Sequence, residues 1–186
     1  ALFAALRSGI VVVNTNPLYT PNEMQHQFKD SGAKAILILS NFAYNLEKVI
    51  SKTDIKHVII SDLGDMLGGI KGFITNFVVK HIKKMVPKYN LPEAISFKKA
   101  IDIGSKYDFK NHNVNSDDIA FLQYTGGTTG VSKGAELTHG NICANVSQVE
   151  AWIGSNIVEG QETIITALPL YHIFALTANC VVFFRY

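Results

Sequence analysis

Apolar runs rich in β-branched residues alternate with helix-forming segments over the first sixty residues, and this order constrains the fold most. The runs cover residues 10–13, 35–39 and 57–60. Thr20 and Glu23 form a capping-box pattern with Pro21 at the first helical position, so a helix begins there, and a second helix is expected over 42–51. A βαβαβ order predicts an α/β fold with parallel sheets flanked by helices.

Composition agrees with a globular domain. Hydrophobic residues make up 47% of the 186-residue chain and charged residues 17%. The formal net charge of +2 gives no sign of a nucleic-acid partner. Cys143 and Cys180 have no metal-ligand spacing, so we expect reduced thiols and a cytoplasmic protein. Both ends resemble interrupted apolar elements, so we expect residues 1–186 to be part of a longer chain.

Residues 63–92 differ from the rest in charge. They carry five lysines against one acidic residue, Asp65. The lysines are Lys71, Lys80, Lys83, Lys84 and Lys88. Apolar residues recur there at helical spacing, which predicts a basic helical insertion within a first portion, 1–118. The helix could lie weakly on the inner face of an anionic membrane, as a peripheral contact, or pack its apolar stripe on its own domain. The second interpretation is favoured.

The second portion, 119–186, begins with an apolar strand at 119–124 that leads into a glycine-rich loop. The loop residues are Tyr124, Thr125, Gly126, Gly127, Thr128, Thr129, Gly130, Val131, Ser132, Lys133 and Gly134. Glycines let backbone N–H groups approach an anion, threonine hydroxyls add donors, and Lys133 adds a positive charge. A helix expected from near Thr138 would bring its positive N-terminal end nearby. This pattern predicts a loop that binds nucleotide phosphates.

Other kinds of glycine-rich loop agree less well with the order of its residues. Runs of Gly, Thr and Ser also occur in ordinary surface turns. A Walker A loop requires Gly before the lysine and Ser or Thr after it, whereas Ser132 precedes Lys133 and Gly134 follows. The spacing of a dinucleotide-binding GxGxxG loop is also absent.

Residues 124–134 resemble the YT(S/G)GTTGxPKG loop of the adenylate-forming superfamily, with Gly126 where many members have Ser and Ser132 where many have Pro. Residues 9–23 and 169–176 resemble two further segments of the same family. The resemblance covers about residues 1–184 and is closest to bacterial long-chain fatty-acid–CoA ligases. It implies that residues 1–186 are part of the large N-terminal, AMP-binding domain of such an enzyme. It implies activation of a fatty acid by ATP to acyl-AMP, followed by thioester formation with CoA.

The resemblance also implies site residues. The loop would hold the ATP phosphates, and Thr125 would reach Mg²⁺ together with an acidic residue expected beyond residue 186. His172 would line or gate the acyl pocket, although a lone histidine in an apolar run is commonly a core residue bonded to backbone. The C-terminal domain and its adenylation lysine are not among these residues, so the chain alone is expected to be inactive.

Three hypotheses therefore remain. The first is part of an acyl-CoA ligase or of another acyl-activating adenylate-forming enzyme. The second is a self-contained, kinase-like phosphate-binding enzyme, for which only Asp117 and Asp118 could supply a nearby acid; they lie at the far end of the strand. The third is a non-catalytic membrane-surface module built on residues 63–92. Acyl chain length and oligomeric state do not follow from the sequence.

Overall fold

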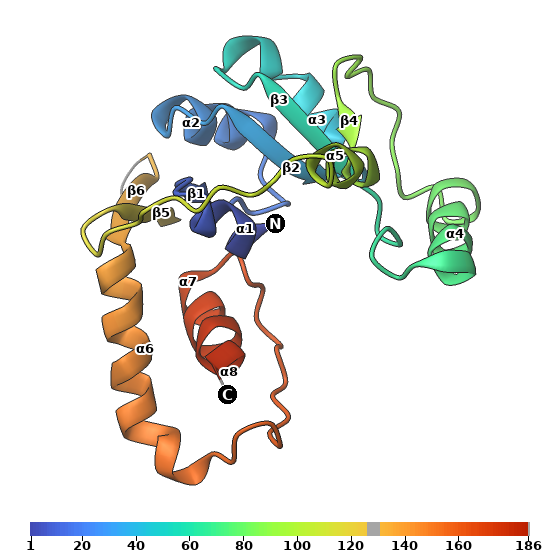
Figure 1. The fold of residues 1–186 in the computed structure, drawn as a ribbon. Coiled ribbons are helices and arrows are strands. Elements are labelled where there is room, and N and C mark those ends of the chain that lie inside the picture. The colour runs from blue at the N-terminus through green and yellow to red at the C-terminus, as the bar shows by residue number, and fades with distance from the viewer. Residues whose placement is uncertain (126–130, 186) are drawn as a thin grey trace. The chain divides into compact units, whose positions relative to one another are not determined.

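A computed structural model describes residues 1–125 and 131–185. The chain divides into two compact units (Figure 1). One unit combines residues 1–16 with 111–186, and the other comprises residues 17–110. The first sixteen residues therefore pack with the C-terminal part of the chain, and each unit is described by itself.

The unit of residues 17–110 contains a parallel three-stranded sheet in the order β2-β3-β4. Its strands are β2 (Ala35–Leu39), β3 (His57–Ser61) and β4 (Ile95–Ser96). Ile36 is aligned with Val58 and Ile38 with Ile60. The predicted second and third strands are confirmed, and the parallel pairing matches the β-α-β order.

Helices α2 (Pro21–Asp30) and α3 (Ala43–Glu47) supply the core of this unit. The predicted capping box is present: the Thr20 hydroxyl accepts from the Glu23 N–H, and the Glu23 carboxylate accepts from the Thr20 N–H at 2.8 Å. The second helix is shorter than predicted, because it ends at Glu47 and a 3₁₀ turn follows over Ile50–Lys52. The buried residues of this core are Met24, Phe28, Ile38, Leu46, Val49, Ile55 and Val58.

The basic segment forms helix α4 (Gly69–Phe77), which continues as a π-helical turn over Val78–Ile82. Its helical character was predicted correctly. Its apolar stripe does not pack on the residues that the structure describes, because Ile70 and Phe73 are 78% and 72% exposed; packing on the rest of the larger domain expected from the sequence stays a prediction. Helix α5 (Phe97–Gly104) follows β4 and packs on β3.

The other unit contains a mixed sheet in the order β1-β5-β6. Strand β1 (Val12–Val13) pairs in parallel with β5 (Ile119–Thr125), which pairs in antiparallel with β6 (Lys133–Thr138). The first predicted strand therefore does not join the β2-β3 sheet, and Ile10 and Val11 remain outside it and exposed. A two-residue β1 gains its hydrogen bonds from the longer β5, more than a hundred residues away.

Helices pack around this mixed sheet. They are α1 (Leu2–Arg7), α6 (His139–Ile153), α7 (Ile173–Ala175), a π-helical stretch (Leu176–Val181) and α8 (Val182–Arg185). Ala120, Phe121 and Leu176 form the buried centre. The rings of Phe3 and Phe184 stack with centroids 4.7 Å apart, so α1 and α8 are in contact. Across 1–125 and 131–185, no helix has the length and apolarity needed to cross a bilayer.

Candidate phosphate-binding site

The predicted phosphate loop joins two strands of an antiparallel pair. Thr125, the last residue of β5, is in register with Lys133, the first residue of β6, and Tyr124 is in register with Gly134. Five loop residues, 126–130, lie outside the described residues, so the roles predicted for Gly126, Gly127, Thr128, Thr129 and Gly130 stay predictions. The two strand ends fix where the loop leaves and re-enters the sheet.

Thr125 and Lys133 lie on the same face of the sheet, because directly opposed residues of an antiparallel pair project to the same side. Both are exposed. Thr125 also ends a strand that runs parallel to β1, which places it at the carboxyl end of that pair. A hydroxyl donor and an ammonium group are therefore presented together at the base of the loop, which suits a polyphosphate anion.

Gly134 makes room for the ring of Tyr124. A Cβ atom on Gly134 would lie 2.9 Å from the Tyr124 Cε2 atom, closer than side chains tolerate. Tyr124 is only 7% exposed, so its ring has little space to move away. The glycine that closes the loop motif thus has a packing role in β6, and Tyr124 holds the strand pair together directly beside Thr125.

The helix after the loop begins where it was predicted, with Thr138 as its N-cap, but its N-terminus does not lie beside the loop. Strand β6 separates the loop from α6, whose N-cap Thr138 is in register with Ile119 at the start of β5. Six residues of strand span about 20 Å, so the N-terminus of α6 lies far from Thr125. The prediction that this helix dipole assists phosphate binding is wrong. The alternation of small and polar residues over 133–138 gave little sign of a strand.

The remaining described loop residues are Val131 and Ser132. Val131 is 67% exposed, and Ser132 is half-buried. Neither position tests the phosphate contacts predicted for the loop. Asp118 lies at the other end of β5, where its carboxylate accepts from the Asn115 N–H at 2.7 Å and its backbone carbonyl accepts from the His139 N–H at 3.0 Å. Asp117 and Asp118 are therefore unsuited to a site at Thr125.

Gln123 is a buried polar residue that the sequence argument missed. It is 6% exposed and lies two residues before Thr125. Its Nε2 donates to the Tyr171 carbonyl at 3.2 Å, and its Oε1 accepts from Asn14 Nδ2 at 3.4 Å. The amide therefore ties the end of β1 and the 169–172 segment to β5. A single polar residue within an otherwise apolar strand was the available signal.

His172 begins helix α7 as its N-cap. Its Nδ1 accepts a hydrogen bond from the Phe174 N–H at 3.3 Å, and its backbone carbonyl accepts from the Leu176 N–H at 2.9 Å. The side chain is exposed. His172 is thus not a core histidine, and the neighbouring Tyr171 is held against Gln123 of the phosphate-loop strand. The acyl-pocket role of His172 stays a prediction.

The described residues offer limited ligands for a cation. Within 1–125 and 131–185, no group of three or more His, Cys, Asp or Glu residues is arranged to hold a metal ion. Thr125 could supply one hydroxyl oxygen, which fits Mg²⁺, a cation that keeps several waters and binds through substrate phosphates. The acidic ligand that the family resemblance implies is expected beyond residue 186.

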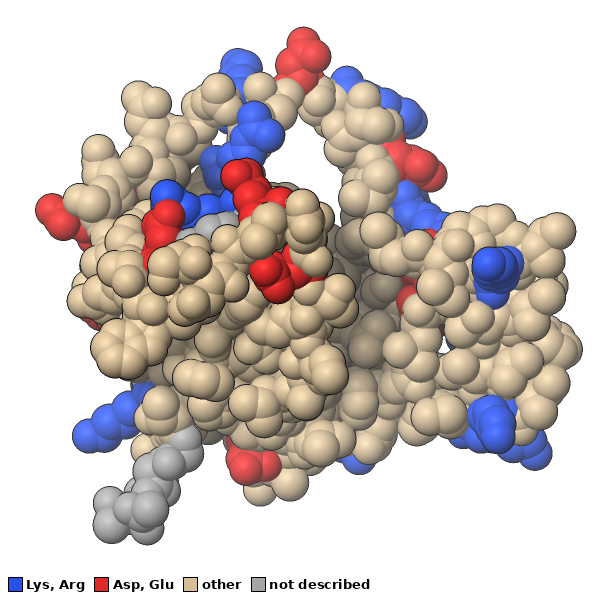
Figure 2. All heavy atoms as spheres, turned by 90° about the horizontal axis from the view of Figure 1, so that it is seen from below, with Lys and Arg blue, Asp and Glu red and all other residues tan. Residues whose placement is uncertain are grey.

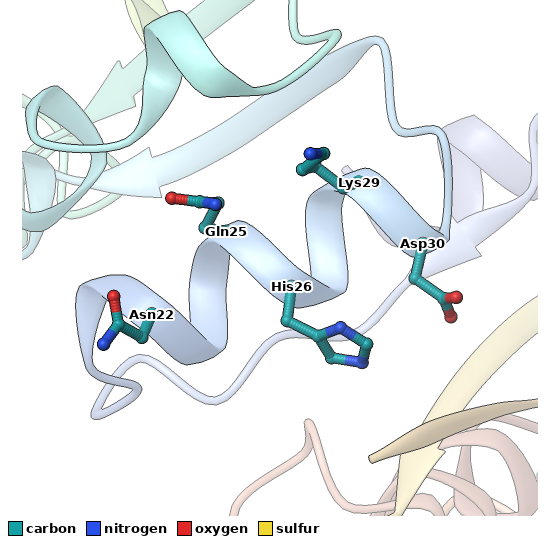
Figure 3. A pocket seen from close by; sticks show the side chains of 5 residues that line it. All are labelled: Asn22, Gln25, His26, Lys29 and Asp30. Atoms are coloured by element: carbon teal, nitrogen blue, oxygen red, sulfur yellow. The ribbon is translucent and has the colours of Figure 1, made fainter. Parts of the chain in front are cut away.

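A surface hollow is formed on α2, in the unit of residues 17–110 (Figure 3). It is lined by Asn22, Gln25, His26, Lys29 and Asp30. Gln25 and Lys29 project from one side of the helix and His26 and Asp30 from another, so their polar groups do not converge (Figure 3). We assign no function to it.

The fold is of the α/β class, and a glycine- and threonine-rich segment between β5 and β6, with Thr125 and Lys133 at its base, is the arrangement expected of a protein that binds nucleotide phosphates. The chain belongs to the family of AMP-binding enzymes, whose family model matches residues 1–185. This result does not support the kinase-like alternative.

Individual relatives agree with this assignment. The chain is 58% identical to a long-chain-fatty-acid–CoA ligase of Salmonella typhimurium and 52% identical to one of Haemophilus influenzae, in each case over 98% of this chain. It spans 33% of each relative's length.

Solved structures share the fold. A long-chain-fatty-acid-CoA ligase from Archaeoglobus fulgidus matches with a TM-score of 0.69 and 29% identity, over 95% of this chain and 29% of that one. A red-emitting luciferase from Phrixothrix hirtus matches with a TM-score of 0.67 and 20% identity, over 95% of this chain and 30% of that one. At that identity the luciferase supports the fold alone.

Proposed function

We propose that this chain is the phosphate-binding part of a long-chain fatty-acid–CoA ligase. The observation that carries the proposal is the 58% identity to such a ligase over nearly all of the chain. The strand pair that presents Thr125 and Lys133 on one face supports it chemically. ATP, a fatty acid and CoA would be the substrates, and the reaction would be completed by regions that this chain does not contain.

In the first step, a carboxylate oxygen of the fatty acid would attack the α-phosphorus of ATP. A new O–P bond forms, the bond between the α-phosphorus and the bridging oxygen breaks, and pyrophosphate leaves with that electron pair. Negative charge therefore grows on the β-phosphate. Lys133 and the Thr125 hydroxyl, placed beside the loop, would stabilise that charge without reorganising.

In the second step, the CoA thiolate would attack the acyl carbonyl and AMP would leave. His172 follows Tyr171, which Gln123 holds close to the phosphate-loop strand, so a position beside the acyl group suits it. Its Nδ1 already accepts from Phe174 N–H, which leaves Nε2 for a substrate or for gating. Mg²⁺, held through Thr125 and the phosphates, would add charge neutralisation at the leaving group.

A cytoplasmic location is part of this proposal. Neither Cys143 nor Cys180 is in a disulfide, which suits a reducing compartment. No nucleic acid is expected among the partners, since the formal net charge is only +2.

Substrate-dependent pyrophosphate exchange in the complete protein tests the proposal. Labelled pyrophosphate should enter ATP when oleate is added, and CoA should convert oleate to its thioester with release of AMP. Acetate and benzoate serve as comparison acids for other acyl-activating enzymes. Exchange with benzoate or acetate but not with oleate would overturn the long-chain assignment, and exchange with no carboxylic acid would overturn adenylate formation.

A further inference from the structure

Gln123 lies on the same face of the β1-β5-β6 sheet as Thr125 and Lys133. Gln123 and Thr125 are two residues apart in β5, so their side chains project to the same side, about 7 Å apart along the strand. Lys133 opposes Thr125 in register, and Ala135 opposes Gln123. The face that presents a hydroxyl and an ammonium group at the base of the loop therefore also carries a buried amide.

The segment of residues 169–176 packs on this face. Phe121, two residues before Gln123 in β5, belongs to the same buried cluster as Leu176. Gln123 Nε2 donates to the Tyr171 carbonyl at 3.2 Å. The amide is only 6% exposed, so water competes little for this bond. The apolar contact therefore holds the helical end of the segment, and the hydrogen bond holds its first turn.

Asn14 orients the Gln123 amide. Its Nδ2 donates to Gln123 Oε1 at 3.4 Å, which leaves Gln123 Nε2 facing the Tyr171 carbonyl. Both side chains are neutral, so the end of β1 and the 169–172 turn are tied to β5 without a buried charge. Charged side chains of both signs are instead interspersed on the outer surface (Figure 2). The orientation of one amide thus links three separate stretches of the chain.

We propose that Gln123, oriented by Asn14, is a positioning residue for the fatty acid in the adenylation step. It acts through the backbone of Tyr171, and so through His172, without touching the substrates. The attacking carboxylate must approach the α-phosphorus while the loop holds the leaving phosphates. One strand sets both positions, with Thr125 at its end and Gln123 two residues earlier. The inference rests on the proposed ligase function and names the residue that sets the fatty-acid side of that site.

Pyrophosphate-exchange kinetics of the complete protein separate positioning from stability. Gln123→Met keeps the side-chain volume and removes both hydrogen bonds. We expect the KM for oleate to rise and kcat/KM for oleate to fall about tenfold, because a small misplacement of a reacting group lowers the rate steeply. The KM for ATP, set by Thr125 and Lys133, should not change. A variant that only lost stability would contain less active protein, which lowers kcat and leaves both KM values as they are.

Asn14→Asp tests the same positioning from the other side of the amide. The introduced carboxylate faces Gln123 Oε1 with an acceptor, which favours turning the amide so that Oε1 faces the Tyr171 carbonyl. The KM for oleate should rise as in Gln123→Met. The double variant should show little further loss, because methionine has no amide to orient. Gln148→Met, at an exposed glutamine, is the matched control and should behave like the parent.

An unchanged KM for oleate in folded Gln123→Met would overturn the positioning role, and so would an equal rise in the KM values for oleate and ATP. Additive effects in the double variant would overturn the role of Asn14. Melting temperatures identify the folded variants, and should Gln123→Met not fold, the two KM values of Asn14→Asp decide alone. Failure of the ligase proposal is distinct, because the parent itself would then show no oleate-dependent exchange.

Discussion

Thr125 and Lys133 oppose each other in the antiparallel register of β5 and β6, at the point where the predicted phosphate loop leaves and re-enters the sheet. Opposed residues have Cα atoms about 4.5–5.5 Å apart and share a face. One hydroxyl and one ammonium group can therefore reach the same anion. Seven residues lie between them in sequence, and the strand pairing brings them together.

Lys133→Ala should weaken use of ATP. A hydrogen bond to a charged group contributes about 1.5–3 kcal/mol, which corresponds to a loss of roughly ten- to a hundredfold in kcat/KM for ATP in the exchange reaction. Lys133→Arg should keep part of the rate because it keeps the charge. Lys52→Ala, at another exposed lysine, should have no effect. An unchanged rate in Lys133→Ala would remove this residue from the site.

Gly134→Ala should destabilise the protein. The new Cβ would meet the ring of buried Tyr124 at 2.9 Å, and overpacking of this kind costs about 1–3 kcal/mol. Gly104→Ala is the matched control, since nothing lies within 4 Å of a Cβ there. Calorimetry of the complete protein should show a lower melting temperature for Gly134→Ala alone. Equal melting temperatures would mean that the ring relaxes freely.

Gln123→Leu should loosen the segment that leads to His172. It leaves the Tyr171 carbonyl and the Asn14 amide without these two hydrogen bonds at a site that is 6% exposed, with a cost of about 1–3 kcal/mol. Hydrogen exchange over residues 169–176 should become faster. The same measurement on Gln148→Leu, an exposed glutamine, should not change. Unchanged protection in Gln123→Leu would contradict its positioning role.

The N-terminus of α2 should weaken in acid. Hydrogen bonds from the Thr20 hydroxyl and, secondarily, from its backbone N–H lower the pKa of Glu23. A lowered pKa contributes stability that is fully present above the ordinary glutamate pKa and is lost as the pH falls through the lower pKa of the folded state. Glu23→Gln should remove the acid dependence of hydrogen exchange at the first turn of α2. An unchanged dependence would assign it to another group.

Much of the fold could be predicted from local sequence signals. Thr20 and Glu23 marked the start of α2 because a capping box depends on residues three positions apart. Strands β2 and β3 followed from short apolar runs. The partner of β1 could not be predicted, because Val12 pairs with Phe121 across a long sequence separation that no local pattern encodes.

The site shows the same division between local and long-range information. The order of residues in the motif identified the loop, but strand β6 was not predicted. The N-terminus of α6 was therefore expected beside the loop, whereas β6 separates the two. The outward direction of the α4 apolar stripe had been given only as the less favoured of two interpretations. Periodicity gives the existence of a stripe but not its direction, which depends on the approach of Gly72 to Gly64 and on the hydrogen bonds of Asn76.

Pyrophosphate exchange by Thr125 variants of the complete protein tests the central claim most directly. Removing one preorganised group that stabilises developing charge typically lowers the rate about 10²- to 10³-fold, and water can replace part of the contact. Thr125→Ala should therefore lower oleate-dependent exchange at least about tenfold, while Thr125→Ser, which keeps the oxygen, should retain much of it. The melting temperature, measured alongside, excludes misfolding. A folded Thr125→Ala protein that exchanges pyrophosphate at the parental rate would contradict the phosphate-binding role of this strand end.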